Sequence, residues 1–151
     1  MAGKRKHQEE PCPVARGVDL VGERWALLIV RDAFDGVRRF GDFQRSLGVA
    51  RNILADRLRL LVEEGVLASR PASDGSAYQE YVLTPKGEAL FPVIVALRQW
   101  GERYLFARGE AHSVLVHRAT GEEVGELALR TADGREVTAA GTVVRKVDGG
   151  A

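Results

Sequence analysis

The chain has 151 residues, of which 45% are hydrophobic and 28% charged, and its formal net charge is +1. This length supports one hydrophobic core of moderate size with a small appendage, and it excludes a second full-sized domain. The low net charge excludes attraction to polyanions by bulk charge alone, so evidence for a nucleic-acid partner has to come from the local distribution of charge.

Residues 1–11 show no helical or strand pattern and are predicted to form a flexible tail. Their basic cluster, at positions 4–6, leads into acidic residues rather than an apolar segment, so no secretory signal is visible. The longest apolar run, Trp25 to Val30, is far shorter than the roughly 20 residues that cross a bilayer. A single cysteine cannot form a disulfide within the chain. We therefore expect a cytoplasmic protein that makes no membrane contact.

Two helices separated by Gly22 are predicted next. Each has apolar residues three or four positions apart, which places them on one face of the helix. These residues are Val14, Val18 and Val21 in the first helix and Trp25, Leu28 and Ile29 in the second. Trp25 is interpreted as a core residue rather than a ligand-stacking one, because it shares a face with Leu28 and Ile29.

Residues 39–65 are predicted to form two short helices joined by a tight turn. Gly48 supplies the backbone freedom for the turn, and Gly65 suits the position that follows the second helix. The inward-facing residues are predicted to be Phe40, Phe43 and Leu47 in the first helix and Leu54, Leu58 and Leu61 in the second. Two helices this close in sequence must cross at a steep angle.

Two extended runs follow, Leu67 to Arg70 and Gln79 to Leu83, with turn-forming residues such as Pro71 and Gly75 between them. The order helix, turn, helix and hairpin predicts a winged helix-turn-helix, a mainly α fold with a β wing. The wing loop contains Asp74 and no Lys or Arg, so the sequence does not support insertion of a basic wing tip into a minor groove.

Thr84 and Pro85 predict the start of a short helix that reaches about Leu90. A longer helix is predicted from Pro92 to Phe106, because proline would interrupt a continuous one. Its apolar stripe is large for the edge of a small domain, which indicates a partner. Together with the first helix of the chain, it is interpreted as a homodimer seam; the alternative is that the stripe packs on its own core. The proposed seam residues are Val14, Val18, Ile94, Leu97, Gly101, Tyr104 and Leu105.

The chain after residue 108 is predicted to be a small β-rich appendage (109–151), which leaves 12–108 as the DNA-binding and dimerisation domain. Turns are expected at Thr120-Gly121 and Asp133-Gly134. The expected strands are Val114–His117, Val124–Arg130, Glu136–Ala139 and Thr142–Val147. His112 and His117 alone cannot form a structural zinc site, which needs four ligands, so neither a metal nor a cofactor is expected. The appendage could extend the dimer, cover a ligand pocket or bind another protein.

The local charge between Arg38 and Arg70 favours a nucleic-acid partner. Seven arginines stand there against four acidic residues, an excess of three positive charges. If the apolar residues of the second helix face inward, Asn52, Ala55 and Arg59 face outward on the part that enters a major groove in this motif. The predicted DNA-binding residues are Arg38, Arg39, Arg45, Arg51, Asn52, Ala55, Arg59 and Arg70.

These residues have different expected roles. Asn can bind adenine, and Arg guanine, through paired hydrogen bonds, so Asn52 and Arg59 are expected to contact bases. Arg51 is expected to contact a base or a phosphate. The arginines around the first helix of the pair are expected to contact phosphates, which fixes position without reading sequence. The alternative for any one arginine is a solvated surface position.

Six ordered motifs resemble the HxlR family of bacterial transcription regulators. They are Cys12-Pro-Val, Gly22-Glu-Arg-Trp25, Arg39-Phe-Gly-Asp-Phe43, Leu54-Ala-Asp-Arg57-Leu58, Gly65-Val-Leu and Tyr81-Val-Leu-Thr84-Pro-Lys-Gly87. The resemblance covers about Cys12 to Phe106. It implies a homodimeric, MarR-related winged-helix protein that binds double-stranded promoter DNA, with repression expected. Where the family often has Ser or Thr at the start of the reading helix, this chain has Ala50, which lacks a capping hydroxyl worth about 1 kcal/mol.

Cys12 precedes Pro13 and is predicted to cap the first helix, whose N-terminus would stabilise a thiolate. The resemblance implies that a cysteine here senses electrophiles or oxidants. A small-molecule effector is a second expected partner. The alternative is an inert, small apolar residue packed at the dimer interface.

An enzyme is not expected, because the chain has no Gly-rich phosphate loop, nucleophile elbow or metal-ligand spacing. The stronger rival is a winged-helix module that binds protein without binding DNA, since one fold supports both functions. Salt separates the two, because only a DNA reader has a duplex affinity that falls steeply with ionic strength.

Overall fold

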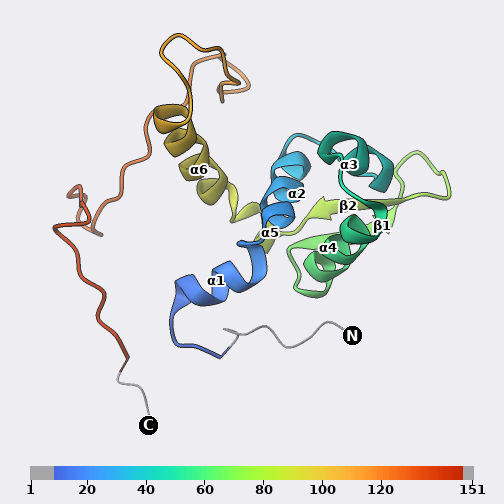
Figure 1. Cartoon of the computed structure of the whole chain (residues 1–151), viewed down its shortest axis with the longest axis horizontal. Coiled ribbons are helices and arrows are strands. Elements are labelled where there is room, and N and C mark those ends of the chain that lie inside the picture. Colours follow the sequence, from blue (N-terminus) through green and yellow to red (C-terminus); the bar gives the residue numbers. More distant parts are fainter. Residues whose placement is uncertain (1–8, 148–151) are drawn as a thin grey trace. The chain divides into compact units, whose positions relative to one another are not determined.

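The computed structural model describes residues 9–147 (Figure 1). Most of the predicted N-terminal tail, residues 1–8, lies outside this range. The chain divides into two compact units, Met1–Phe91 and Pro92–Ala151. This division groups the last long helix with the C-terminal chain, whereas the sequence grouped it with the DNA-binding domain. Within residues 9–147, no helix combines the length and the apolar composition needed to cross a membrane.

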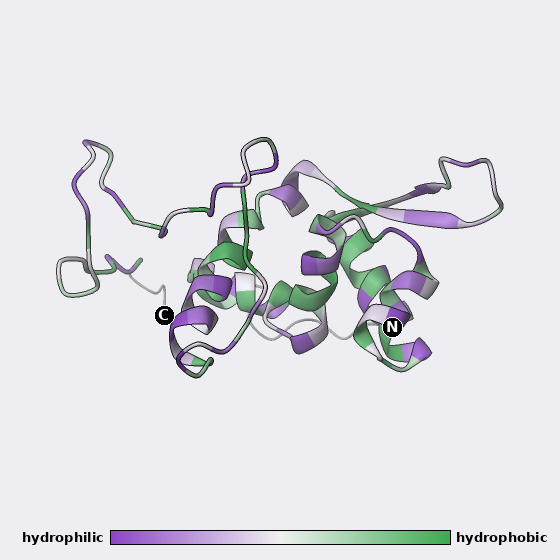
Figure 2. Ribbon diagram, turned by 90° about the horizontal axis from the view of Figure 1, so that it is seen from above, coloured by the Kyte–Doolittle hydropathy of each residue, from purple (hydrophilic) through white to green (hydrophobic). Residues whose placement is uncertain are grey.

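The core of the first unit lies among α2 (Arg24–Phe34), α3 (Phe40–Leu47) and α4 (Arg51–Glu63), and α2 packs against both other helices. Figure 2 shows hydrophobic colouring on these helices and hydrophilic colouring along the wing strands. The largest fully buried side chains include Phe43, Ile29, Leu54, Leu58 and Leu61. The inward face predicted for the second helix of the pair is therefore confirmed.

Trp25 is a partial correction to the predicted core. Ile29 is fully buried, but Trp25 and Leu28 are only half-buried. The guanidinium of Arg24 lies 4.9 Å from the centre of the Trp25 ring. An indole is too large to be enclosed at the first turn of α2, so Ile29 and Val30, one turn further on, fill the core instead.

The two predicted turns have the backbone conformation that glycine permits. Gly48, after α3, has φ +62°, and Gly65, after α4, has φ +74°. Both values lie in the left-handed region, which is costly for residues with a Cβ. Ala50 is the N-cap of α4 and supplies no side-chain hydrogen bond, as expected for a residue without a hydroxyl.

The wing is a two-stranded antiparallel sheet of β1 (Leu67–Pro71) and β2 (Gln79–Leu83), in which Leu67 pairs with Leu83 and Pro71 with Gln79. The backbone N–H of Tyr81 also donates a 2.7 Å hydrogen bond to the carbonyl of Arg38, just before α3. The wing is therefore fixed to the start of α3 by a backbone contact distant in sequence.

The base of the wing packs closely on α5 (Pro85–Glu88), which ends earlier than the predicted Leu90. The Thr84 hydroxyl accepts a hydrogen bond from the N–H of Gly87 at 3.1 Å and donates one to the carbonyl of Val66, also at 3.1 Å. Gly87 is buried. A Cβ there would lie 2.1 Å from the Val66 carbonyl oxygen and 3.0 Å from Leu83 Cδ2. Only glycine fits this contact.

The second unit begins with α6 (Phe91–Tyr104) and continues as a chain without further helix or strand through residue 147. The four strands predicted there were wrong. The described residues contain only two isolated β-bridges, between Val116 and Glu123 and between Arg130 and Glu136. The predicted turns are present, since Gly121 and Gly134 have positive φ. The alternating pattern forms no sheet because no residue of this stretch is buried against another layer.

Gly87→Ala should lower the free energy of unfolding by about 1–3 kcal/mol, since its methyl group would overlap the Val66 carbonyl. Gly17→Ala is the matched control: Gly17 lies in α1 (Pro13–Val21), and no atom lies within 4 Å of the added Cβ. The control should be neutral or stabilising by about 0.5–1 kcal/mol. Urea unfolding measures both; equal stabilities for the two variants would contradict the close contact.

Candidate nucleic-acid interface

The first half of α4 presents a face that the core does not use. Asn52, Ala55 and Arg59 are all exposed, while Leu54 and Leu58 on the opposite side are buried. The three predicted contact residues therefore share one accessible face. The amide of Asn52 and the guanidinium of Arg59 are groups that can read base edges in a major groove.

Most of the predicted contact arginines are paired with nearby carboxylates in the unbound protein. Three of these pairs are exposed to solvent and therefore contribute little to stability. They are Arg59 with Asp56, Arg45 with Asp42, and Arg39 with Asp74 in the wing loop. A DNA phosphate could replace each carboxylate without a large loss of folding energy.

Aromatic rings support two of the arginines. The Arg51 guanidinium lies 4.8 Å from the centre of the Phe40 ring, and that of Arg39 lies 5.1 Å from the Tyr78 ring. Stacking limits the motion of a guanidinium while its donors stay available. The sequence missed this role of Phe40 and Tyr78, although an aromatic residue beside an arginine is a readable signal.

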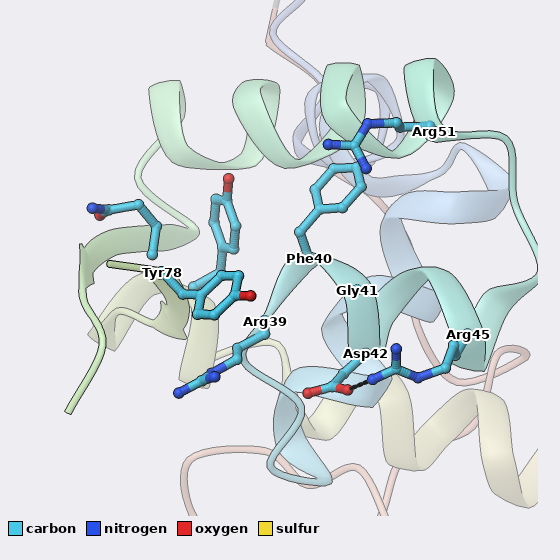
Figure 3. Close-up of a pocket in the computed structure, with 9 residues that line it drawn as sticks. Arg39, Phe40, Gly41, Asp42, Arg45, Arg51 and Tyr78 are labelled. Atoms are coloured by element: carbon cyan, nitrogen blue, oxygen red, sulfur yellow. Dashed lines mark hydrogen bonds and ion pairs between the residues drawn. The ribbon is translucent and has the colours of Figure 1, made fainter. Parts of the chain in front are cut away.

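These side chains surround a hollow of about 490 Å³ between α3, the start of α4 and β2 (Figure 3). In Figure 3 the Arg51 guanidinium lies over the Phe40 ring, and Tyr78 lies beside Arg39. The lining comprises Arg39, Phe40, Gly41, Asp42, Arg45, Arg51, Tyr78, Gln79 and Tyr81. The three arginines expected to contact phosphates here thus lie around one concave surface.

Asp74 is the carboxylate that the wing contributes to this region. Hydrogen bonds from the backbone N–H and then the side chain of Ser76, followed by the bond from Arg39, lower the pKa of Asp74 to about 2. The bond to Asp74 in turn raises the pKa of Arg39. Asp74 is therefore ionised at neutral pH and competes with any phosphate for Arg39.

Glu80 organises the base of the wing loop, a role that the sequence did not reveal. It is only 4% exposed, and its Oε1 accepts hydrogen bonds from both the backbone N–H and the hydroxyl of Ser73, each at 3.1 Å. Its other oxygen lies 3.4 Å from Arg70 and 3.7 Å from Arg38. The Ser73 N–H is the main cause of a lowered Glu80 pKa. Arg38 and Arg70 thus have a structural partner as well as exposed surface.

Arg57 is structural rather than part of the reading face. Its Nε lies 2.8 Å from Glu23, and its Nη1 lies 2.7 Å from Asp56. Glu23 also caps α2 by accepting hydrogen bonds from the N–H groups of Trp25 and Ala26. Arg57 therefore joins α4 to the start of α2.

The proposed seam residues lie on two helices, each with apolar surface that its own unit leaves exposed. In α1 no residue is buried, and Val14 and Val18 are 72% and 57% exposed. In α6 only Val95 is buried, and Ile94 and Gly101 are half-buried. Leu97 and Tyr104 are exposed in α6, as is Leu105 directly after it.

Cys12 caps α1, as predicted. Its Sγ accepts a hydrogen bond from the N–H of Ala15 at 3.4 Å, and the residue is exposed. The thiol is therefore accessible to reagents in the single chain.

Glu80→Gln should lower the free energy of unfolding at pH 7, because it removes the charge that holds Ser73, Arg38 and Arg70. The folded-state pKa of Glu80 lies below the ordinary 4.5, so ionised Glu80 stabilises the fold above that pH, and the contribution is lost as the pH falls through the folded pKa. The gap between parent and variant should therefore close in acid. Urea titrations from pH 7 to pH 3 measure it, with Glu63→Gln, at an exposed position of α4, as control. A gap that is constant with pH would contradict this role.

Comparison with known proteins identifies the family. A family model described as HxlR-like helix-turn-helix matches residues 20–108. The HTH-type transcriptional regulator Mb3122 of Mycobacterium bovis, itself uncharacterized, is 46% identical over 134 residues, which cover 88% of this chain and 84% of Mb3122.

Two solved structures agree with this match. The crystal structure of PA1607, a candidate transcription factor, has a TM-score of 0.88 and 55% identity, covering 93% of this chain and 99% of that one. PA1374 from Pseudomonas aeruginosa has a TM-score of 0.61 and 40% identity, covering 93% and 95%. The resemblance seen in the sequence motifs is thus confirmed, and the chain belongs to the HxlR-like helix-turn-helix family of DNA-binding transcriptional regulators.

Proposed function

We propose that this regulator binds an inverted-repeat operator as a homodimer and represses transcription. The observation that carries the proposal is the exposed face of α4, where Asn52, Ala55 and Arg59 are free of the core. In helix-turn-helix proteins the start of the second helix enters the major groove. Asn52 and Arg59 read bases, and Ala55 leaves room for the approach of the groove edge.

The DNA backbone lies against the hollow between α3, α4 and β2. Arg39, Arg45 and Arg51 line that hollow and bind phosphates, while Arg38 and Arg70 add positive charge at the base of the wing. Contacts of this kind set position and supply salt-dependent affinity. The wing loop carries Asp74, so the wing adds no cation of its own at its tip.

The homodimer forms through the exposed apolar surfaces of α1 and α6. A two-fold axis makes the same patch of both subunits meet, and it places two reading helices in successive major grooves about 10 base pairs apart. The rival function is a winged-helix module that binds only protein. Loss of duplex affinity between 50 and about 200 mM salt supports the DNA reader, whereas negligible duplex affinity at every salt concentration supports the rival.

Asn52→Ala and Arg59→Ala should each relax the preference for one base pair of the operator, by about 1–3 kcal/mol of discrimination. Arg45→Ala is the control, because loss of a phosphate contact should weaken binding to all duplexes alike. Duplexes selected from a random pool by the parent protein provide the targets for titration. Unchanged selectivity in both α4 variants would contradict the assignment of the reading face.

Leu97→Asp should convert the dimer to a monomer, because two buried carboxylates would meet near the two-fold axis. Leu97 is 52% exposed in the single chain, so the variant should still fold. Sedimentation equilibrium measures the mass and circular dichroism the fold. Ser46→Asp, at an exposed position of α3, is the control and should remain dimeric. A dimeric Leu97→Asp variant would exclude this seam.

We also propose that DNA binding responds to electrophiles or oxidants through Cys12. The supporting observation is an exposed thiol at the N-terminus of α1, a helix assigned to the seam, so a modified thiol would disturb the dimer. Since the chain has one cysteine, the product is an adduct, a sulfenic acid or a disulfide between subunits. Cys12→Ser should abolish the response of DNA binding to diamide, and a persisting response would exclude the thiol.

A further inference from the structure

The chain after α6 is an arm rather than a folded layer. In residues 107–147, here called the C-terminal arm, no residue is buried, and only Leu115 and Val137 are half-buried. Figure 1 draws the arm in orange to red, without helix or strand. Toward its end, Val143 is 92% exposed, Val144 78% and Val147 70%. Apolar side chains at this density on an open segment indicate a surface that a partner covers.

The first part of the arm is held on one face of α6 by polar contacts. Arg98 donates to the carbonyl and hydroxyl of Ser113 at 3.1 and 2.9 Å. Gln99 donates to the carbonyl of Gly125 at 3.0 Å and accepts from the N–H of Leu127 at 2.8 Å. These contacts give the arm a defined start.

The opposite face of α6 remains open. Val93, Leu97, Trp100 and Tyr104 recur at helical spacing and are all exposed, while Arg98 and Gln99 lie on the other side of the helix. The arm therefore does not cover the apolar stripe assigned to the dimer seam.

Beyond Leu127 the arm bonds only to itself. Its second turn is a small hairpin, in which Thr131 donates to the carbonyl of Arg135 and Val137 to that of Leu129. Among the residues described, no hydrogen bond joins 128–147 to α6. A two-stranded hairpin alone is marginally stable in water, and ordering each residue costs about 1–2 kcal/mol. A fixed course for this segment requires a surface to bind.

We propose that the C-terminal arm of one subunit packs on a second copy of this chain, with its valines on the partner. The proposal rests on the homodimer of the proposed function and extends its interface. A second copy is the one partner always present, and the match to PA1607 covers 93% of the chain and so takes in most of the arm. The arm has a linear reach too: its last 20 residues could span up to about 70 Å when extended.

Photocrosslinking between isotopically distinct subunits tests the proposal. The full chain with Val144→p-benzoylphenylalanine is prepared in ¹⁴N and ¹⁵N forms, mixed equally, unfolded and refolded together. Roughly half of the crosslinked peptide pairs should join chains of different label, as expected for a symmetric dimer. Crosslinks confined to one label, or none outside the arm, would overturn the proposal. Mixing without unfolding is the control and should give fewer mixed pairs.

A second measurement uses the affinity of the dimer. The double variant Val143→Ser with Val144→Ser should raise the dissociation constant about tenfold or more, because two exposed valines lose their burial on the partner. Lys146→Gln, at a neighbouring exposed position, is the matched control and should leave the constant near that of the parent. If the parent is a monomer at every concentration, the homodimer itself fails. If the parent dimerises with a constant that the valines do not affect, only the arm proposal fails.

Discussion

The burial of one leucine stripe determines the geometry of the reading face. Leu54, Leu58 and Leu61 are at most 1% exposed, and their packing against α2 and α3 fixes the rotation of α4 about its own axis. Once this rotation is set, Asn52 and Arg59 point away from the core, because side chains on a helix keep a constant angular spacing. A polar residue at Leu58 would not only weaken the core; it would also remove the constraint that selects the outward face.

Local patterns were sufficient to predict the helices, turns and wing of the first unit. The turns at Gly48 and Gly65, the stripes of α3 and α4 and the cap at Cys12 each depend on neighbours within a few positions. Such features can be read from spacing because the helix repeat and the glycine conformation are local properties. The N-terminal half of α4 as the accessible helix face was predictable for the same reason.

Contacts between distant residues could not be read in this way. Glu80 binds Ser73 across the wing, Arg57 binds Glu23 across two helices, and Tyr81 bonds to the carbonyl of Arg38. None of these pairings has a spacing signal, because the fold, and not the local sequence, brings the partners together. The strands expected after residue 108 were wrong for a related reason: an alternating pattern indicates a sheet only where a second layer covers one face.

The pairing of arginines with carboxylates has a kinetic consequence for a protein that must find one site among many. A contact surface whose cations are already neutralised attracts a polyanion weakly at long range, so encounters with arbitrary duplex would be brief. Phosphates must displace Asp42, Asp56 and Asp74 before they bind, and that exchange is favourable where the bases also fit α4. Search along a chromosome would therefore proceed by short visits, with retention decided after contact rather than before it.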